Sequence, residues 1–176
     1  MNKTSMNAWD MQNELMRISD QTRPDNYEVN KTSILYSALI LEEVAELLTS
    51  LHKIIINTDN ATLEGIVKEF EFMKSQIHTS SLEIRNNLKF IPDFSIFPSR
   101  DEVIELADAA TDIAVVNCGF TIASGINGAS CYEEVVCSNL SKSNPETGII
   151  DKDESGKWIK GSGYFAPSLE KILYPL

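Results

Sequence analysis

The sequence predicts an all-α fold, a bundle of four to five helices followed by an irregular C-terminal tail. Apolar residues recur at intervals of three and four through most of the first 140 residues, which is the period of a helix with one buried face. Capping patterns and turn residues divide these stretches into separate helices. Beyond about residue 140 the helical period gives way to closely spaced turn signals.

The first two helices are separated by a break that contains proline. Residues 5–20 are expected to form a short amphipathic helix with Trp9, Leu15 and Ile18 on or near one face and Ser5 as a possible N-cap, and the break follows at 23–26. A long, largely buried second helix is expected from about residue 30 to residue 56. Its apolar positions at helical spacing are Ile34, Leu35, Ala38, Leu41, Val44, Ala45, Leu48 and Leu51.

Three further helices are expected. The third, capped near Thr62, reaches about residue 87, and a loop with two prolines follows it. Ser99 and Glu102 form a capping-box pattern that opens a fourth helix, which should persist to about residue 124. After the glycines of 125–128, a shorter fifth helix is expected at 131–140.

The C-terminal residues differ in character from the rest. Turn signals at 144–148 and 153–156 flank Ile149-Ile150, and Trp158-Ile159 follow, as in a small hairpin or an ordered tail. We therefore expect a helical catalytic domain at 1–142 and a C-terminal tail at 143–176 that packs on the same domain.

Composition excludes several classes of protein. The chain has 176 residues, of which 43% are hydrophobic and 23% charged, as in a soluble globular protein of one domain. Its formal net charge of −11 would repel a phosphate backbone, so nonspecific binding to nucleic acid is not expected. If phosphates bind, cations must bridge them.

Location and redox state are also constrained. The longest apolar run, residues 34–41, is too short to span a bilayer, and the first six residues lack the apolar stretch of a secretory signal. We therefore expect a cytosolic protein without a membrane partner. Cys118, Cys131 and Cys137 are odd in number and form no C-x-x-C pair, so we expect neither a disulfide framework nor a zinc site, but buried free thiols.

Two acidic stripes are the strongest chemical signal. On the second helix, Glu43 and Glu46 share a face, as do Glu42 and Glu46, in otherwise apolar surroundings. The fourth helix repeats this arrangement with three acidic residues that are spaced by three and then four. They are Glu105, Asp108 and Asp112. Carboxylates in apolar surroundings need protons or a cation, and oxygen ligands without His or Cys favour Mg²⁺ or Mn²⁺.

Two other interpretations of the stripes remain open. They can be solvated helix faces, although few basic residues lie near them in sequence to form ion pairs, Lys53 and Arg100 being the nearest. Facing carboxylates also build di-iron sites, but the usual Glu-x-x-His is absent, and His52 is expected to be a partly buried helix residue rather than a ligand. No Walker-A loop, Rossmann turn or nucleophile elbow is present, so metal-assisted hydrolysis is the favoured chemistry.

The motifs resemble a known family. Leu41-Glu42-Glu43-Val44-Ala45-Glu46-Leu47 and Glu105-Leu106-Ala107-Asp108 are similar to the EExxE…ExxD signature of the MazG-like all-α NTP pyrophosphohydrolases. Residues 108–113, with Gly119 and 125–127, resemble the DAxxDI…G…GI(D) run of phage members. Parts of 134–167 resemble their EV…SNxSK…GK…KG…Y…P tail. The resemblance covers about residues 34–169, excepting 57–99.

The resemblance implies a function and roles for individual residues. Family members cleave a nucleoside triphosphate between the α and β phosphates with two or more Mg²⁺ or Mn²⁺ ions, and they are dimers or tetramers. By resemblance, the main ligands would be Glu43, Glu46, Glu105 and Asp108, with Glu42 on a metal or the attacking water and Asp112 on an outer metal. The phosphate contacts would be Asn139 and Lys142, with Lys157 or Lys160 from the tail.

The resemblance also has departures and alternatives. Asn127 stands where phage relatives often have Asp, which puts one metal or substrate contact in question, and the helix at 60–90 is longer than expected. Phage members of the MazZ type, which hydrolyse dGTP or GTP, are the most similar, and a phage-encoded enzyme would work in the host cytoplasm. A house-cleaning pyrophosphatase of other nucleotides and a noncatalytic metal-binding or assembly module are alternatives. The tail can also be a surface arm.

Overall fold

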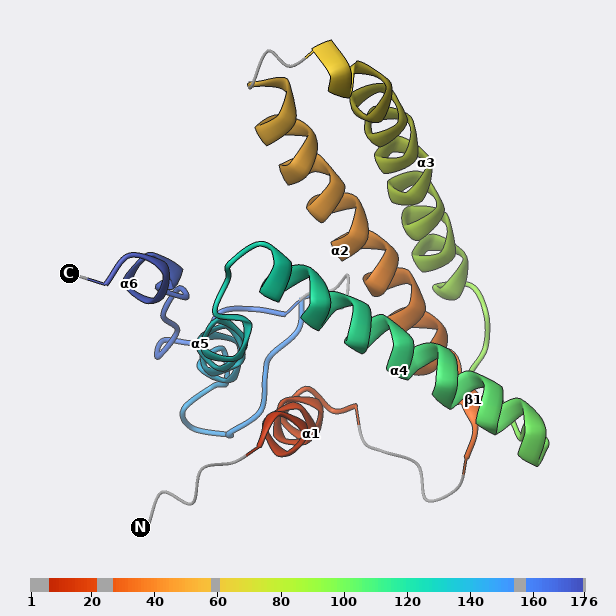
Figure 1. Ribbon diagram of the computed structural model, residues 1–176. Coiled ribbons are helices and arrows are strands. Elements are labelled where there is room, and N and C mark those ends of the chain that lie inside the picture. Colours follow the sequence, from red (N-terminus) through yellow and green to blue (C-terminus); the bar gives the residue numbers. More distant parts are fainter. Residues whose placement is uncertain (1–6, 22–26, 58–60, 154–157, 176) are drawn as a thin grey trace. The chain divides into compact units, whose positions relative to one another are not determined.

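The computed structural model describes residues 7–21, 27–57, 61–153 and 158–175. It is 68% helix, with six α-helices and two short strands in these described ranges (Figure 1). The predicted all-α class is therefore confirmed. The chain divides into two compact units, residues 26–98 and residues 1–25 with 99–176, and each is described by itself.

The unit at 26–98 is a helical hairpin. Helix α2 (Lys31–Ile56) runs antiparallel to α3 (Glu64–Leu88), with a 3₁₀ turn (Ala61–Leu63) before α3 (Figure 1). Strand β1 (Val29–Asn30) pairs antiparallel with β2 (Ser95–Ile96). The predicted extents of α2 and α3 agree with the structure within one or two residues, although α3 lacks a side-chain cap, so the predicted cap near Thr62 is wrong.

Small residues bring the two helices of the hairpin together. Ala38 and Ala45 are buried on α2, and the buried Ser81 of α3 donates a hydrogen bond to the carbonyl oxygen of Ala38 at 2.7 Å. Asn30 caps α2 in a reciprocal capping box with Ser33. This local signal and the apolar period explain why the helix begins where the sequence predicts.

The other unit contains α1 (Ala8–Ile18), α4 (Arg100–Ala123), α5 (Gly128–Leu140) and the short α6 (Leu169–Leu173). Helix α1 packs against α5 (Figure 1). Leu15 and Ile18 of α1 form a buried cluster with Ile150 of the tail, against which Leu140 and Trp158 pack. The amide of Ile150 donates to the carbonyl oxygen of Ile18 at 2.7 Å, so backbone contacts also join the tail to α1.

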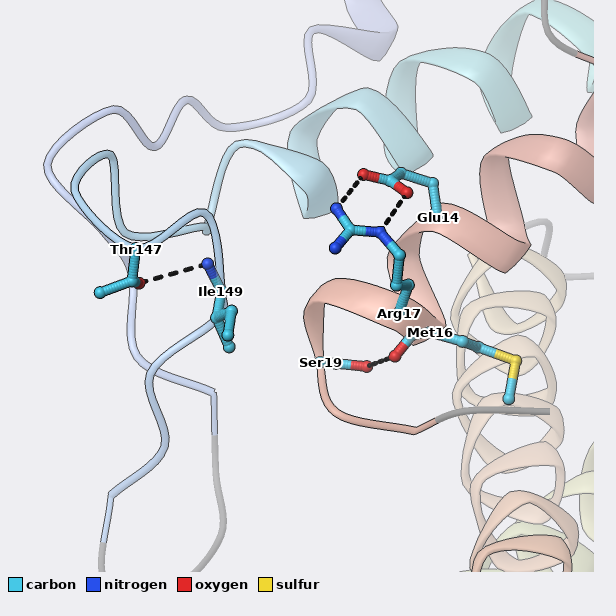
Figure 2. A network of polar contacts seen from close by, with 6 residues as sticks. All are labelled: Glu14, Met16, Arg17, Ser19, Thr147 and Ile149. Atoms are coloured by element: carbon cyan, nitrogen blue, oxygen red, sulfur yellow. Dashed lines mark hydrogen bonds and ion pairs between the residues drawn. The ribbon is translucent and has the colours of Figure 1, made fainter. Parts of the chain in front are cut away.

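Side-chain hydrogen bonds stabilise the C-terminal end of α1. Figure 2 shows Arg17 donating to both carboxylate oxygens of Glu14, at 2.7 and 2.6 Å, while the buried Ser19 donates to the carbonyl of Met16 at 3.1 Å. In the tail, the amide of Ile149 donates to the hydroxyl of Thr147 at 3.3 Å. The contacts of Arg17 and Ser19 stabilise the end of α1, and the contact of Thr147 stabilises the turn before Ile150.

Helix α4 is apolar yet has no buried residue. Ser99 caps it with Glu102 in the predicted capping box, and it ends before Gly125, whose φ of 69° suits glycine. Val116 and Ile122 are 70% and 77% exposed. By length and composition alone, α4 is also the one described helix apolar enough to cross a membrane.

Several local predictions are wrong. The N-cap of α1 is Asn7, and Ser5 lies outside the described residues. Leu15 and Ile18 lie on the buried face as predicted, with Met11, whereas Trp9 is 76% exposed and lies off that face. Helix α5 begins three residues earlier than predicted, and α6 was not predicted.

The predicted burial of the three thiols is wrong as well. Cys118 is exposed on α4, and Cys131 and Cys137 are half-buried on α5. All three cysteines are free. Their burial follows that of the helices that carry them, since α4 has no buried residue and α5 is partly buried.

Candidate functional site

The acidic stripe of α2 has one paired and two unpaired carboxylates. Arg85 of α3 donates to Glu42 at 2.5 Å, with the two side chains 38% and 27% exposed. Glu43 and Glu46 are exposed and form no ion pair with a described residue. Only the antiparallel pairing of α2 with α3 brings Arg85 to Glu42, 43 residues away, so sequence spacing did not reveal this partner.

The charged form of Glu43 is disfavoured by its surroundings in this stripe. Partial burial raises the pKa of its carboxyl above the ordinary value, and the negative charges of Glu46 and Glu42 raise it further. A carboxylate in these surroundings gains more than an isolated one from a bound proton or cation. The stripe is therefore suited to a divalent cation.

The second stripe lies on α4, in the other unit. Glu105, Asp108 and Asp112 are exposed, at the predicted spacing of three and four residues along one helix. Within the described ranges, none of them forms an ion pair. In those ranges, moreover, no three His, Cys, Asp or Glu side chains lie close enough together to hold a metal. The donors are all carboxylate oxygens, which suit Mg²⁺ or Mn²⁺.

Three of the predicted phosphate-binding residues lie together in the unit formed by α5 and the tail. Lys142 Nζ donates to Asn139 Oδ1 at 2.7 Å and lies 5.5 Å from the centroid of the Trp158 ring. Lys160 Nζ lies 4.4 Å from the centroid of the Tyr164 ring. The two lysines thus rest on aromatic faces at the point where the tail meets the end of α5.

Lys142 is also electrostatically perturbed. Burial lowers the pKa of its ammonium below the ordinary value. The negative charge that Tyr164 can carry opposes this shift, and the positive charge of Lys160 adds to it. Lys142 is half-buried and Lys160 is exposed, and an anion between two like charges stabilises both. The lysines and Asn139 therefore form a candidate phosphate contact.

Close backbone packing holds the two lysines near each other. The amide of Gly161 donates to the carbonyl oxygen of Lys142 at 3.1 Å. A Cβ atom at residue 161 would lie 2.4 Å from the carbonyl oxygen of Ser143, closer than real contacts allow. Glycine at this position is required for the segment that carries Lys160 to approach the segment that carries Lys142.

Of the two remaining predicted substrate residues, Asn127 and Lys157, the structure describes only Asn127. Asn127 is the N-cap of α5, and its side-chain oxygen accepts from the amide of Ser130 at 3.3 Å. Since Asn and Asp cap helices equally well, this explains why either residue fits the position. Lys157 lies outside the described residues.

Comparisons with protein-family models, with curated proteins and with solved structures find no match to this chain.

Proposed function

We propose that this chain is a MazG-like all-α nucleoside triphosphate pyrophosphohydrolase that uses two or more Mg²⁺ or Mn²⁺ ions. The observation that carries the proposal is the pair of acidic triplets, each at helical spacing on one long apolar helix. They are Glu42, Glu43 and Glu46 on α2, and Glu105, Asp108 and Asp112 on α4. The raised pKa of Glu43 supports the proposal because a divalent cation would stabilise its charged form.

The proposed reaction breaks the phosphoanhydride bond between the α and β phosphates. The water oxygen bonds to phosphorus, a carboxylate accepts the water proton, and a nucleoside monophosphate and pyrophosphate are released. The bound metal ions would neutralise phosphate charge and lower the pKa of the attacking water. Glu43, Glu46, Glu105 and Asp108 would hold them, with Asp112 on an outer ion.

Glu42 has a separate role in this proposal. Arg85 fixes the orientation of its carboxylate through Oε2. Oε1 can then accept a hydrogen bond from the attacking water or contact a metal. Arg85 is in this sense a positioning residue, which acts on the reaction through Glu42.

The cluster at the end of α5 would bind the phosphates. Asn139 and Lys142 are in contact with each other, and Lys160 is near enough for its charge to shift the pKa of Lys142. An ammonium on a half-buried stem presents a compact charge that suits a phosphate oxygen. Lys157 and Asn127 remain further candidates for this role.

For the base we propose guanine, as in MazZ-type enzymes, so dGTP and GTP would be the best substrates in phage nucleotide metabolism. Trp9 is exposed on α1 and therefore available for stacking, with Gln12 half-buried and Asn13 exposed beside it. Amide groups match the mixed donors and acceptors of the guanine edge. Rates with the four dNTPs under one metal concentration test this choice, and a preference for dATP or a pyrimidine would overturn it.

We propose a cytoplasmic enzyme, in the host cytoplasm if phage-encoded, with no nucleic-acid or membrane partner. Although α4 has the length and composition of a membrane span, its apolar portion includes Asp108 and Asp112. Each acidic residue at the centre of a bilayer costs about 2.5–3.5 kcal/mol. The same net charge of −11 disfavours a phosphate backbone as partner.

Substitution of one ligand in each stripe tests the proposal. Glu46→Gln and Asp108→Asn should each lower kcat by about 1,000-fold or more, because a two-metal site loses charge neutralisation and water activation together. Pyrophosphate release in saturating Mg²⁺ measures the effect, and the exposed Glu69→Gln on α3 is the control for loss of charge. Near wild-type rates in either variant would overturn the site assignment.

A noncatalytic metal-binding or assembly module and a house-cleaning pyrophosphatase are the alternatives. One assay separates all three: pyrophosphate release from the eight common NTPs and dNTPs, with Mg²⁺ and with EDTA. Metal-dependent release from guanine nucleotides supports the proposal, and broad release supports house-cleaning. Absence of release from every nucleotide supports the noncatalytic module.

A further inference from the structure

An open pocket of about 350 Å³ lies between α2 and α3, within the unit at 26–98. Its volume is near the lower end of the range of about 300–1,000 Å³ typical of small-molecule sites. Helix α2 contributes Glu46, and α3 contributes Lys74 and His78. The full lining is Ala45, Glu46, Thr49, Lys74, Ser75 and His78. The α3 residues lie in the segment that the family resemblance does not cover.

Lys74 is held in a defined position. Its Nζ lies 2.7 Å from Oε2 of Glu71, and the same oxygen lies 3.3 Å from Nε2 of His52 on α2. The Lys74 side chain is 23% exposed, against 73% for Lys68, which lies on the same helix with Glu64 at 2.7 Å. An ammonium has three N–H donors, so two remain after the contact with Glu71. Lys74 is thus oriented and has donors available.

The charges lining the pocket favour one kind of occupant. Glu46 would repel a bare anion, and Lys74 would repel a bare cation. A phosphate chain that carries a divalent metal satisfies both, with the metal on Glu46 and a phosphate oxygen on the ammonium. Ser75 and His78 are exposed at the pocket, and the side chains of both can donate to further phosphate oxygens.

We infer that Lys74 binds a phosphate of a metal-complexed polyphosphate chain whose metal is held by Glu46. The inference rests on the proposed function only for the assignment of a metal to Glu46. It makes α3 part of the substrate site and assigns Glu71 the task of orienting the lysine.

Calorimetric titration of the intact chain with tripolyphosphate in Mg²⁺ tests the inference without requiring turnover. Lys74→Met should weaken binding about tenfold or more, because a hydrogen bond to a charged group is lost. The matched control Lys68→Met removes an exposed lysine of the same helix and should change binding by less than about twofold. Binding by the wild type should fall sharply when EDTA replaces Mg²⁺.

The outcomes separate this inference from the proposed function. Equal binding by Lys74→Met and Lys68→Met, or wild-type binding that is independent of Mg²⁺, overturns the inference even if the protein hydrolyses nucleotides. A selective loss in Lys74→Met supports the pocket even if no nucleotide is hydrolysed, in which case only the proposed function fails. Thermal unfolding of both variants shows whether a loss of binding arises from unfolding, and Lys74→Arg, which keeps the charge, should then restore most of the affinity if the inference holds.

Discussion

Single carboxylates on α2 differ in charge environment although they are adjacent in sequence. Glu42 has a guanidinium partner, whereas Glu43 has two acidic neighbours and a raised pKa. Between the ordinary value of 4.5 and the raised native pKa, the native state therefore binds more protons than the unfolded state. The stability that Glu43 contributes is fully present below the ordinary value and is lost as pH rises through the native pKa.

This sign leads to a prediction for the metal-free protein. Glu46→Gln removes the neighbouring charge that raises the pKa of Glu43 more than the charge of Glu42 does, so the variant should lose less stability than the wild type between pH 4.5 and pH 7. The difference should stay below about 1 kcal/mol because solvent screens an exposed side chain. Urea denaturation in EDTA at the two pH values measures it. Glu69→Gln, with the same charge change elsewhere in the unit, should match the wild type, and an equal gain there would contradict the explanation.

At the scale of elements, helix pairing and the tail decide which side chains can act together. The hairpin brings Arg85 to Glu42 and lines the pocket beside Glu46 with Lys74. The tail brings Lys160 toward Lys142 through a backbone approach that allows no side chain at residue 161. In both cases, packing brings together side chains that are far apart in the sequence.

The tail contact can be tested with two glycines that lie two residues apart. Gly161→Ala should destabilise the tail by about 1–3 kcal/mol, because its Cβ would overlap the carbonyl oxygens of Ser143 and Lys142. It should also raise KM by separating the lysines. Gly163→Ala has open space and should resemble the wild type in both respects. Limited proteolysis and initial rates measure the two effects, and a normal KM in a Gly161→Ala protein with a loosened tail would remove the lysine pair from the substrate site.

At the scale of the whole molecule, apolar surface is the outstanding feature. Every residue of α4 is at least partly exposed, including Val116 at 70%, and Ile54 on α2 is 62% exposed. Apolar helix faces are normally covered by packing, and on α4 they lie beside the acidic stripe of Glu105, Asp108 and Asp112. Exposed apolar area of this kind is typical of an association surface.

We therefore predict a homo-oligomer, a dimer or tetramer. Light scattering at micromolar concentration should give a mass that is a multiple of 19.6 kDa. Val116→Asp on α4 should weaken the assembly, whereas Glu69→Gln on the exposed surface of α3 should leave it unchanged. A wild-type monomer under these conditions would contradict the prediction.

The sequence by itself determined the features that depend on neighbouring residues. The extents of α2, α3 and α4, the capping box at Ser99 and the spacing of the acidic stripes follow from local periodicity and caps. Asn139 and Lys142 are three residues apart at the end of α5, and the structure shows them in direct contact. In each of these cases the deciding interactions lie within one or two turns of a helix.

Only the tertiary structure decided the rest, because the interactions join residues far apart in the chain. The partner of Glu42 is Arg85 of α3, and Trp9 is exposed because Leu15 and Ile18 take the face of α1 that meets Ile150. The pocket has Glu46 of α2 and Lys74 of α3 in its lining only because the two helices pack against each other. Such pairings depend on how helices pack against each other, which the period of a single helix does not contain.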